Sequence, residues 1–266
     1  MDFTNKVALI TGGGGGIGRA TALAFALRGA KVMVVDHDAE SGHVTTDVVA
    51  QRGGDAKFTR ADVTKSASVR DYVKATLDAY GRIDHFFNNA GIEGKVMPTQ
   101  DYDEAVFDQV IAVNLKGVFL GLRYVLPEML KQGGGTVVNT ASVAGLFGGP
   151  GMPAYVASKH GVLGLTKVAS SDVAPHGIRV NAVCPGPVET RMMRSLESQR
   201  NPNDPEGVHR AYSATMPTGR YTLPEEVAGV VLYLSSELSG NVTGTHIVVD
   251  GGRSGSGGAP ATRRPQ

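Results

Sequence analysis

The sequence predicts a single-domain α/β fold, built as a doubly wound parallel sheet of about seven strands with helices on both faces. Two observations carry this prediction. Short β-branched apolar runs alternate with longer amphipathic stretches, which is typical of parallel strands joined by crossover helices. A glycine-rich turn also follows the first apolar run and opens the first amphipathic stretch. With 266 residues, of which 41% are hydrophobic and 19% charged, the chain is long enough to bury one large core.

The strands and helices can be placed in order along the chain. Strands are expected at 7–10, 31–35, 56–59, 83–87, 136–140, 179–183 and 246–249. Helices are expected between them at about 17–29, 38–52, 66–80, 102–131, 153–174 and 224–235. Asp38, Ser66 and Asp101 stand where an N-cap is expected. Right-handed crossovers then wind the chain to both sides of the first strand.

The domain organisation follows from the same alternation. No repeat or composition shift interrupts residues 1–252, so these residues are expected to form one domain. Residues 189–220 have no clear period and are long for a connection, which is typical of a substrate-binding lid. Residues 253–266 contain no acidic residue and no apolar period, and we expect them to form a disordered tail.

Composition and charge exclude several classes of protein. A net charge of +1 without a long basic run offers little to a nucleic acid. No segment approaches the ~20 apolar residues of a membrane span and no signal-peptide pattern is present, so we expect a cytoplasmic protein without membrane contact. The histidines are scattered singly and no Cys/His cluster exists, which predicts no metal site. The single cysteine, Cys184, is expected to be a small buried hydrophobe in a reducing compartment.

The glycine-rich turn, Thr-Gly-Gly-Gly-Gly-Gly-Ile-Gly at residues 11–18, lies between a strand and a helix. Glycines there permit a tight turn, let backbone amides approach a pyrophosphate and leave the helix N-terminus facing its charge. The cofactor contacts expected in this Rossmann-like turn are Gly12, Gly16, Ile17 and Gly18. A nucleotide triphosphatase is excluded, because Arg19 and Ala20 stand where a phosphate-binding loop has lysine and serine or threonine.

An acidic residue, Asp36, ends the second strand. Its carboxylate can accept hydrogen bonds from both ribose hydroxyls of an adenosine, and it would repel a 2′-phosphate at the same place. Asp36 therefore predicts NAD as the preferred cofactor over NADP. The alternative is that Asp36 is only a helix cap or a solvated loop acid.

A serine, a tyrosine and a lysine form the candidate catalytic set. Tyr155 and Lys159 are four residues apart near the start of a predicted helix and so share a face. A tyrosine pKa of about 10 is too high for a base at neutral pH, and a nearby ammonium favours the phenolate. Ser142 follows the fifth strand, where ligands bind in such sheets. Without Ser142, the Tyr155/Lys159 pair would be interpreted as two surface side chains with no catalytic role.

Taken together, these motifs resemble the short-chain dehydrogenase/reductase family across nearly the whole chain before the tail. The matching residues are Thr11-Gly12-x3-Gly16-Ile17-Gly18, Asn88-Asn89-Ala90-Gly91, Asn114, Ser142, Tyr155-x3-Lys159, Pro185-Gly186 and Val249-Asp250-Gly251-Gly252. The resemblance implies that Tyr155 is the acid/base, that Ser142 hydrogen-bonds the substrate oxygen, and that Lys159 tunes Tyr155 and holds the nicotinamide ribose. It also implies that Asn114 keeps a water in a proton relay from Lys159.

The resemblance implies further cofactor contacts along the cleft. Asp62 and Val63 would face the adenine, Asn89 the adenosine side, and Val188 and Thr190 the carboxamide end. Asn88 is expected to fasten neighbouring strands. Serine hydrolysis, the competing chemistry, lacks a Gly-x-Ser-x-Gly elbow, and His160 points off the Tyr155/Lys159 face.

The expected function is NAD-dependent hydride transfer between a secondary alcohol and its ketone. The substrate pocket is expected to contain Ser142, Ala144, Phe147, Met152, Tyr155, Pro187 and Met192, which favours an apolar or cyclic substrate. One alternative is an enzyme like 3-oxoacyl-[acyl-carrier-protein] reductase, and another is a non-catalytic NAD-binding sensor or scaffold. Since family members are commonly tetramers, a homo-oligomer, with a tetramer favoured, is expected.

Overall fold

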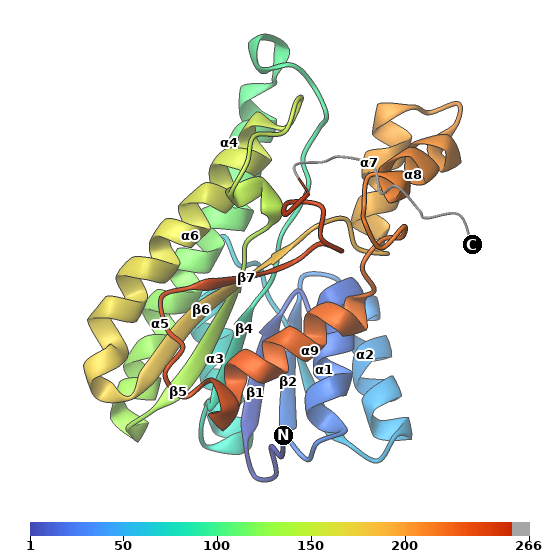
Figure 1. The fold of residues 1–266 in the computed structure, drawn as a ribbon. Helices are drawn as coiled ribbons and strands as arrows, with labels where there is room; N and C mark the ends of the chain where they lie inside the picture. The colour runs from blue at the N-terminus through green and yellow to red at the C-terminus, as the bar shows by residue number, and fades with distance from the viewer. Residues whose placement is uncertain (257–266) are drawn as a thin grey trace.

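All seven expected strands form one parallel sheet in the computed structural model, which describes residues 1–256 (Figure 1). The strands are β1 (Val7–Thr11), β2 (Lys31–Asp36), β3 (Asp55–Arg60), β4 (His85–Asn88), β5 (Gly135–Thr140), β6 (Ile178–Pro185) and β7 (His246–Val249). Across the sheet their order is β3-β2-β1-β4-β5-β6-β7. From β1 the chain forms β2 and β3 at one edge. It then crosses back past β1 and forms β4 to β7 on the other side. The doubly wound α/β fold is confirmed, and its direction reverses between β1 and β4.

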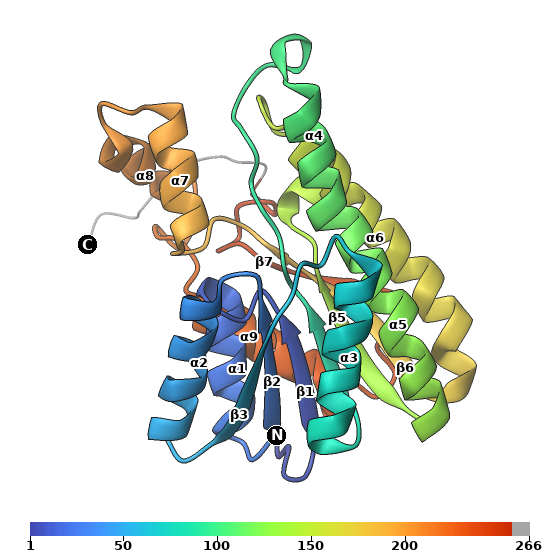
Figure 2. The ribbon, with the colours of Figure 1, turned by 180° about the vertical axis from the view of Figure 1, so that it is seen from behind.

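Helices cover both faces of the sheet (Figures 1 and 2). One face carries α1 (Gly16–Ala26), α2 (Ala39–Gln51) and α9 (Pro224–Ser235), and the other carries α3 (Ser66–Tyr80), α5 (Gly117–Gln132) and α6 (Pro153–Val173). Strand β1 shows the alternation that this requires. Leu9 packs into the core under α3 and α5, whereas Ala8 and Ile10 pack into the core under α1 and α9.

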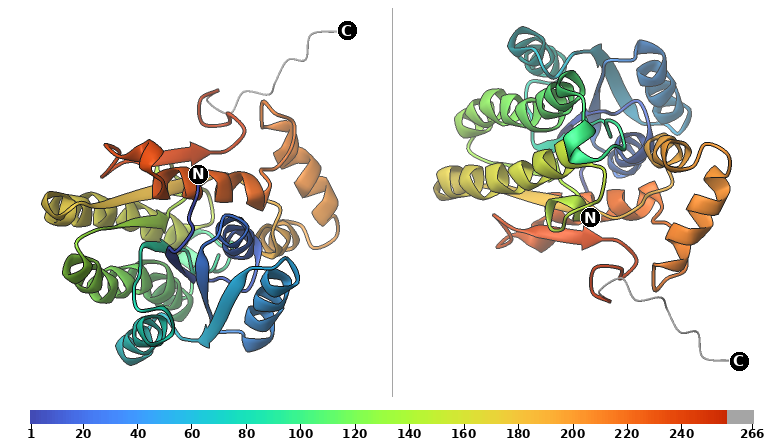
Figure 3. Two further views of the ribbon diagram at one scale, coloured as in Figure 1. Left: turned by 90° about the horizontal axis from the view of Figure 1, so that it is seen from below. Right: turned by 90° about the horizontal axis from the view of Figure 1, so that it is seen from above.

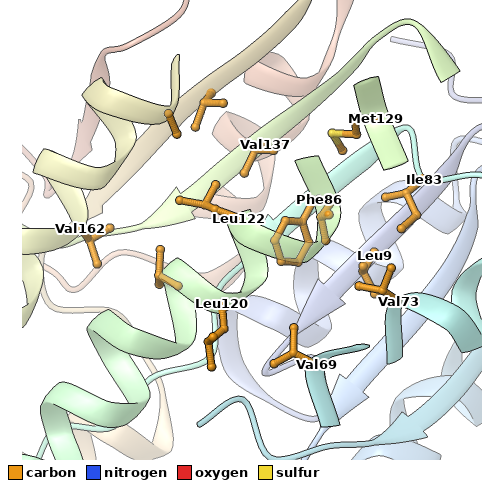
Figure 4. Close-up of a cluster of buried hydrophobic side chains, with 14 of the residues drawn as sticks. Leu9, Val69, Val73, Ile83, Phe86, Leu120, Leu122, Met129, Val137 and Val162 are labelled. Atoms are coloured by element: carbon orange, nitrogen blue, oxygen red, sulfur yellow. The ribbon is translucent and has the colours of Figure 1, made fainter. Parts of the chain in front are cut away.

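Figure 4 shows the core between the sheet and α3, α5 and α6. Leu9, Phe86 and Val137 point from three neighbouring strands towards Leu120 and Leu122 of α5. Each of these five side chains is at most 4% exposed. Full burial of such a side chain contributes roughly 1.5–3 kcal/mol, so the core fixes the strand ends on which the site is built.

The helix starts follow the predicted caps only in part. Asp38 caps α2, because its carboxylate accepts a hydrogen bond from the amide of Glu40. The other two predictions are wrong. Ser66 is the first residue of α3 and makes no side-chain cap bond, and Asp101 lies in a short 3₁₀ turn. Asp103 caps α4 (Glu104–Ile111) instead, accepting from the amide of Val106 at 3.1 Å.

The long helix expected at 102–131 is interrupted. Helix α4 continues into a π turn (Ala112–Lys116) before α5 begins. The whole stretch Glu104–Gln132 has 29 residues and a mean hydropathy of 1.5 in its most apolar window, so by length and composition alone it is suited to crossing a membrane. In the structure α5 packs on α3 and on β4. The absence of membrane contact stays a prediction.

Two helices lie within the expected lid at 189–220, which the sequence had suggested to be irregular. They are α7 (Arg191–Arg200) and α8 (Pro205–Ala214), and they stand apart from the sheet beyond its carboxyl edge (Figures 1 and 3). Thr190 caps α7, while Asp204 caps α8 with Pro205 in its first turn. The segment 189–220 therefore contains two short helices, each with a capping residue.

The expectation of a disordered tail is wrong for residues 253–256. Residues 253–256 form turns that fold back on Asp250, whose carboxylate accepts from the amides of Gly252 and Ser254 at 2.9 and 2.7 Å. The remainder of the expected tail, 257–266, lies outside the described residues.

Candidate active site

A single cleft runs along the carboxyl ends of the strands, from the glycine-rich turn to the lid helices. Its volume is about 1640 Å³. Small-molecule sites usually measure roughly 300–1,000 Å³, so this cleft has room for a dinucleotide and a second molecule. The location is the one expected for a doubly wound sheet, because the strands end together at the point where their order reverses.

The glycine-rich turn has the geometry of a phosphate cradle. Gly12 has a φ of +64°, and a Cβ there would lie 2.9 Å from the Cα of Ala90. Gly15, the N-cap of α1, supplies no side chain to bond the first helical amides. Those amides are therefore left to an anion, and the turn fits a pyrophosphate.

Most of the predicted cofactor contacts line this cleft. They are Gly12, Gly16, Ile17, Asp36, Asp62, Val63, Asn89, Tyr155, Lys159, Val188 and Thr190. Gly18 does not line it. A Cβ on Gly18 would lie 2.0 Å from the carbonyl oxygen of Gly12, so Gly18 lets α1 pack directly beneath the turn. Its role in the structure is to support the turn rather than to face a ligand.

Asp36 lies at the adenosine end of the cleft, with its side chain 12% exposed. One carboxylate oxygen accepts from the amide of Gly14 at 2.9 Å, and the other accepts from the amide of Asp38 at 3.1 Å. Asp36 is not the cap of α2, since Asp38 performs that role. The helix-cap alternative is therefore wrong, and a carboxylate is held at the place where a ribose would lie.

The sequence did not indicate the cation near Asp36. Arg60 lines the same end of the cleft, and its Nε donates to the carbonyl oxygen of His37 at 3.0 Å. The signal for it was the register between β2 and β3, in which Asp36 pairs with Arg60. The adenosine end thus holds a guanidinium as well as the carboxylates of Asp36 and Asp62.

Two adjacent asparagines hold the floor of the cleft. Asn88 Nδ2 donates to the carbonyl oxygen of Val118 at 3.0 Å and to Asn139 Oδ1 at 3.2 Å, which confirms its fastening role. Asn89 Nδ2 donates to the carbonyl oxygen of Thr11 at 3.1 Å, while Asn89 Oδ1 accepts from Thr140 Oγ1 at 3.0 Å. Asn89 thereby ties β1, β4 and β5 together directly below the glycine-rich turn.

The catalytic candidates meet on one wall of the cleft. Lys159 is 3% exposed; its Nζ donates to the carbonyl oxygen of Thr140 at 2.7 Å and lies 5.6 Å from the centroid of the Tyr155 ring. Ser142 Oγ accepts from the amide of Ala144 at 3.1 Å and donates to the carbonyl oxygen of Pro185 at 3.3 Å. The strand-end serine and the helical tyrosine and lysine are thus brought together.

The protonation states of this set differ in one respect from the sequence prediction. Burial raises the pKa of Tyr155, with the Ser142 hydroxyl opposing the shift and the Glu93 carboxylate adding to it. Burial also lowers the pKa of Lys159 to about 8. The predicted lowering of the Tyr155 pKa is not found, because burial is the largest influence on this phenol and acts in the opposite direction. Tyr155 is therefore a neutral phenol, ready to donate a proton.

Asn114 lies in the π turn of the long helix and is fully buried. Its amide bonds both backbone groups of Ile92, accepting from the N–H at 2.8 Å and donating to the carbonyl at 2.9 Å. A Cβ on Gly91 would lie 3.3 Å from Asn114 Oδ1 and 3.6 Å from Lys159 Nζ, so Asn114 and Lys159 flank Gly91. The water relay implied for Asn114 stays a prediction.

The substrate end of the cleft is more polar than predicted. The expected pocket residues all line it, namely Ser142, Ala144, Phe147, Met152, Tyr155, Pro187 and Met192. Tyr212, from the segment expected to be the lid, lines it as well, together with four charged residues that the sequence did not indicate: Glu93, Arg191, Arg200 and Arg253. No local motif marks these four, and the three arginines reach the cleft only through the folding of the lid and of the turn after β7.

The rival sites gain no support from the geometry. His160 is exposed and its Nδ1 lies 2.9 Å from the carbonyl oxygen of Val156, in its own helix. Cys184 is fully buried, which confirms its role as a small hydrophobe. Within residues 1–256 there is no group of three or more His, Cys, Asp or Glu side chains suited to a metal ion. That observation does not test the expectation that the protein binds no metal.

Comparison with known proteins agrees with the geometry. Residues 13–254 match the family model described as enoyl-(acyl carrier protein) reductase. The chain is 45% identical over 254 residues to levodione reductase of Leifsonia aquatica, with 95% of each chain covered. It is 41% identical over 249 residues to cyclohexanol dehydrogenase of Acinetobacter sp. strain SE19, covering 94% of this chain and 95% of that one. It is also 41% identical over 252 residues to 3-oxoacyl-[acyl-carrier-protein] reductase of Thermotoga maritima, covering 95% and 99%.

Solved structures extend the similarity to three dimensions. The crystal structure of levodione reductase superposes with a TM-score of 0.94 at 44% identity, covering 96% of this chain and 99% of that chain. NAD⁺-bound xylitol dehydrogenase superposes with a TM-score of 0.90 at 36% identity, covering 94% and 99%. Together with the Ser142, Tyr155 and Lys159 wall and the glycine-rich turn, these matches show that the chain is an oxidoreductase of the short-chain dehydrogenase/reductase family.

Proposed function

We propose that the protein transfers a hydride reversibly between a secondary alcohol, apolar or cyclic, and NAD to give a ketone. The observation that carries the proposal is the continuity of the cleft. One end is the glycine-rich turn with Asp36, and the other is the wall formed by Ser142, Tyr155 and Lys159. A dinucleotide on the turn would reach that wall, which carries both a proton donor and a hydroxyl for the substrate oxygen.

The chain's own residues handle the proton. When bound, the nicotinamide accepts the hydride from the alcohol carbon or returns it to the ketone carbon. In reduction, the neutral phenol of Tyr155 donates its proton to the ketone oxygen, and Ser142 Oγ donates a hydrogen bond to the same atom. In oxidation, Tyr155 takes the hydroxyl proton. The buried ammonium of Lys159, 5.6 Å from the centroid of the Tyr155 ring, would stabilise the phenolate that reduction leaves and would bind ribose hydroxyls.

The preference for NAD rests on Asp36. Its carboxylate is held by the amides of Gly14 and Asp38 and is free to accept from ribose hydroxyls, whereas a 2′-phosphate would meet a fixed negative charge. Arg60 lies at the same end and would partly offset this repulsion. The NAD⁺-bound state of the similar xylitol dehydrogenase supports the assignment.

The substrate class rests on the pocket and on the relatives. Phe147, Met152 and Met192 give the substrate end an apolar surface suited to a ring. Two relatives at 45% and 41% identity are named for a dione and for cyclohexanol. We therefore place cyclic alcohols and ketones first.

The decisive experiment follows the absorbance of reduced nicotinamide with NAD or NADP across a panel of secondary alcohols. We expect turnover with NAD on a cyclic alcohol, and a loss of kcat of about 100-fold or more in Tyr155→Phe, because that variant lacks the transferable proton. Full activity in Tyr155→Phe would contradict the mechanism. A Tyr102→Phe variant, altering a tyrosine outside the cleft, serves as the control and should keep wild-type kcat.

The cofactor preference has its own test. Asp36→Ala removes the acceptor for the ribose hydroxyls and the charge facing a 2′-phosphate. We expect the ratio of kcat/KM for NAD over NADP to fall about tenfold or more, because hydrogen bonds to charged groups contribute roughly 1.5–3 kcal/mol. A wild-type preference for NADP would contradict the role of Asp36.

A second candidate activity is reduction of a 3-oxoacyl group on an acyl carrier protein. The relative from Thermotoga maritima favours it. Activity with a 3-oxoacyl thioester but none with cyclic ketones would select this alternative. A non-catalytic NAD-binding role has less support, since Ser142, Tyr155 and Lys159 are all present on the cleft wall.

We further propose a homotetramer in the cytoplasm. Apolar side chains that this chain leaves exposed support an oligomer, among them Phe119 on α5 and Val168 on α6, which are 44% and 62% exposed. The cytoplasmic location rests on the single thiol, which has no partner for an intramolecular disulfide.

A further inference from the structure

Two arginines flank one aromatic ring at the outer, substrate end of the cleft. Arg200, the last residue of α7, has its guanidinium carbon 5.5 Å from the centroid of the Tyr212 ring on α8. Arg253, from the turn after β7, has its guanidinium carbon 5.4 Å from the same centroid. All three side chains line the cleft. Two positive groups from distant parts of the chain thus contact one ring.

Neither guanidinium is neutralised by a carboxylate in the part of the chain that the structure describes. The neighbouring arginines differ in this respect. Arg194 pairs with Glu189 and Glu197 at 3.1 and 3.0 Å, and Arg210 pairs with Asp204 at 3.8 Å. Stacking on an aromatic face uses the π surface of a guanidinium and leaves its in-plane N–H groups free to donate. Arg200 donates one weak hydrogen bond, from Nη2 to Met152 Sδ, and both arginines keep further donors for another partner.

The acidic groups at this end are otherwise engaged or lie elsewhere on the wall. Glu197 is 1% exposed and is held by Arg194 and His209. Asp250 accepts from the amides of Gly252 and Ser254. Glu93 lines the cleft beside Tyr155 and raises its pKa. The positive end is thus formed by the lid and the last turn, opposite the catalytic wall.

The position of Arg200 relates this positive end to the reacting groups. Its Nη2 lies 3.9 Å from Met152 Sδ, and Met152 immediately precedes α6, whose first turn carries Tyr155. A molecule with its carbonyl at Tyr155 would pass Met152 before it reached the guanidinium groups. The cleft therefore offers, in order, a proton donor, an apolar surface and a pair of cations.

We propose that Arg200 and Arg253 bind a carboxylate carried by the alcohol or ketone substrate, and that Tyr212 orients both guanidinium groups for this contact. The substrate class is then an apolar or cyclic hydroxy acid or keto acid rather than a neutral alcohol. Guanidinium donors match a carboxylate in a bidentate geometry, which fixes orientation as well as affinity. This inference rests on the proposed function and refines its substrate.

The kinetic test compares two alcohols that differ by one group, cyclohexanol and 3-hydroxycyclohexanecarboxylate, with NAD and the full chain. The variants are Arg200→Gln and Arg253→Gln, and the control is Arg210→Gln, an arginine of α8 paired with Asp204 and outside the cleft. We expect wild type to favour the acid. The ratio of kcat/KM for the acid over cyclohexanol should fall about tenfold or more in each test variant and stay unchanged in Arg210→Gln. A wild-type ratio that favours cyclohexanol, or that the variants do not change, would overturn the inference.

A binding measurement separates this inference from the proposed function. Calorimetric titration of cyclohexanecarboxylate into the protein with NAD present requires no turnover. We expect binding that weakens about tenfold or more in Arg200→Gln and Arg253→Gln, and that Arg200→Lys only partly restores, because an ammonium cannot donate in a bidentate fork. No binding, or equal binding in wild type and variants, would overturn the carboxylate site. If arginine-dependent binding occurs but neither alcohol is oxidised, the proposed function fails and the site remains.

Discussion

His85 shows how one buried residue makes folding depend on pH. It is 7% exposed, stacks on Phe25 with ring centroids 5.5 Å apart, and its Nδ1 lies 2.7 Å from Thr136 Oγ1. Its Nε2 has no hydrogen-bond partner in the described part of the chain. Burial lowers the pKa of His85 to about 4, from an ordinary value of 6.5. The folded state therefore resists a proton that the unfolded state accepts.

The sign of the pH effect follows from that shift. Between pH 6.5 and 4 the unfolded chain binds the proton and the folded chain does not, so stability falls as the pH falls through this window. We expect His85 to account for a loss of about 3 kcal/mol in the free energy of unfolding across it. Urea titrations at several pH values measure the effect, which His85→Phe should remove. His176→Phe, at an exposed turn, should retain the wild-type slope.

At the scale of elements, the first turn of α1 depends on the lack of one side chain. A Cβ on Gly18 would meet the carbonyl oxygen of Gly12 at 2.0 Å, whereas a Cβ on Gly15 would meet nothing within 4 Å. We expect Gly18→Ala to lower the free energy of unfolding by about 1–3 kcal/mol through overpacking. Gly15→Ala is the matched control and should stay near wild type in thermal melting without cofactor. Equal melting temperatures for the two variants would contradict this account of the turn.

The sequence predicts the strands well, because buried parallel strands are apolar along their whole length and β-branched residues mark them. It does not predict α7 and α8. No side chain of α8 is buried within the described chain and its apolar residues are few, so the clearest local signals are the caps Thr190 and Asp204. The π turn also escapes prediction, because no local residue type marks a change in backbone hydrogen-bond register.

The site residues also divide into those that the sequence predicts and those that it does not. Ser142, Tyr155 and Lys159 can be predicted because their chemistry is tied to short spacings and to a strand end. Arg200 and Arg253 cannot, because each approaches Tyr212 only after the lid and the last turn have folded over the cleft. The direction of the Tyr155 pKa shift also needed the structure, because burial of the phenol decides it and the spacing to Lys159 does not.

At the scale of the whole molecule, the exposed apolar side chains test the proposed tetramer. Phe119 and Val168 lie on the neighbouring helices α5 and α6. We expect wild type to elute as a tetramer in size-exclusion chromatography with light scattering, and Phe119→Ser combined with Val168→Ser to shift it to a smaller species. Val44→Ser, at a similarly exposed apolar residue of α2, should leave the assembly intact. A monomeric wild type would contradict the proposal.

The π turn at Ala112–Lys116 has a consequence for the surface of the long helix. One additional residue in a turn rotates everything beyond it by about 100° relative to a continuous α-helix. The side chains of α4 and those of α5 therefore point in directions that one continuous helical repeat does not relate. A helical wheel drawn through Glu104–Gln132 as one period would assign the residues of one of the two helices to the wrong side. Deleting Val113 should restore one frame, swinging Asn114 away from Ile92 or turning α4 off its present neighbours. The number of residues in this helix is therefore constrained, as well as their types.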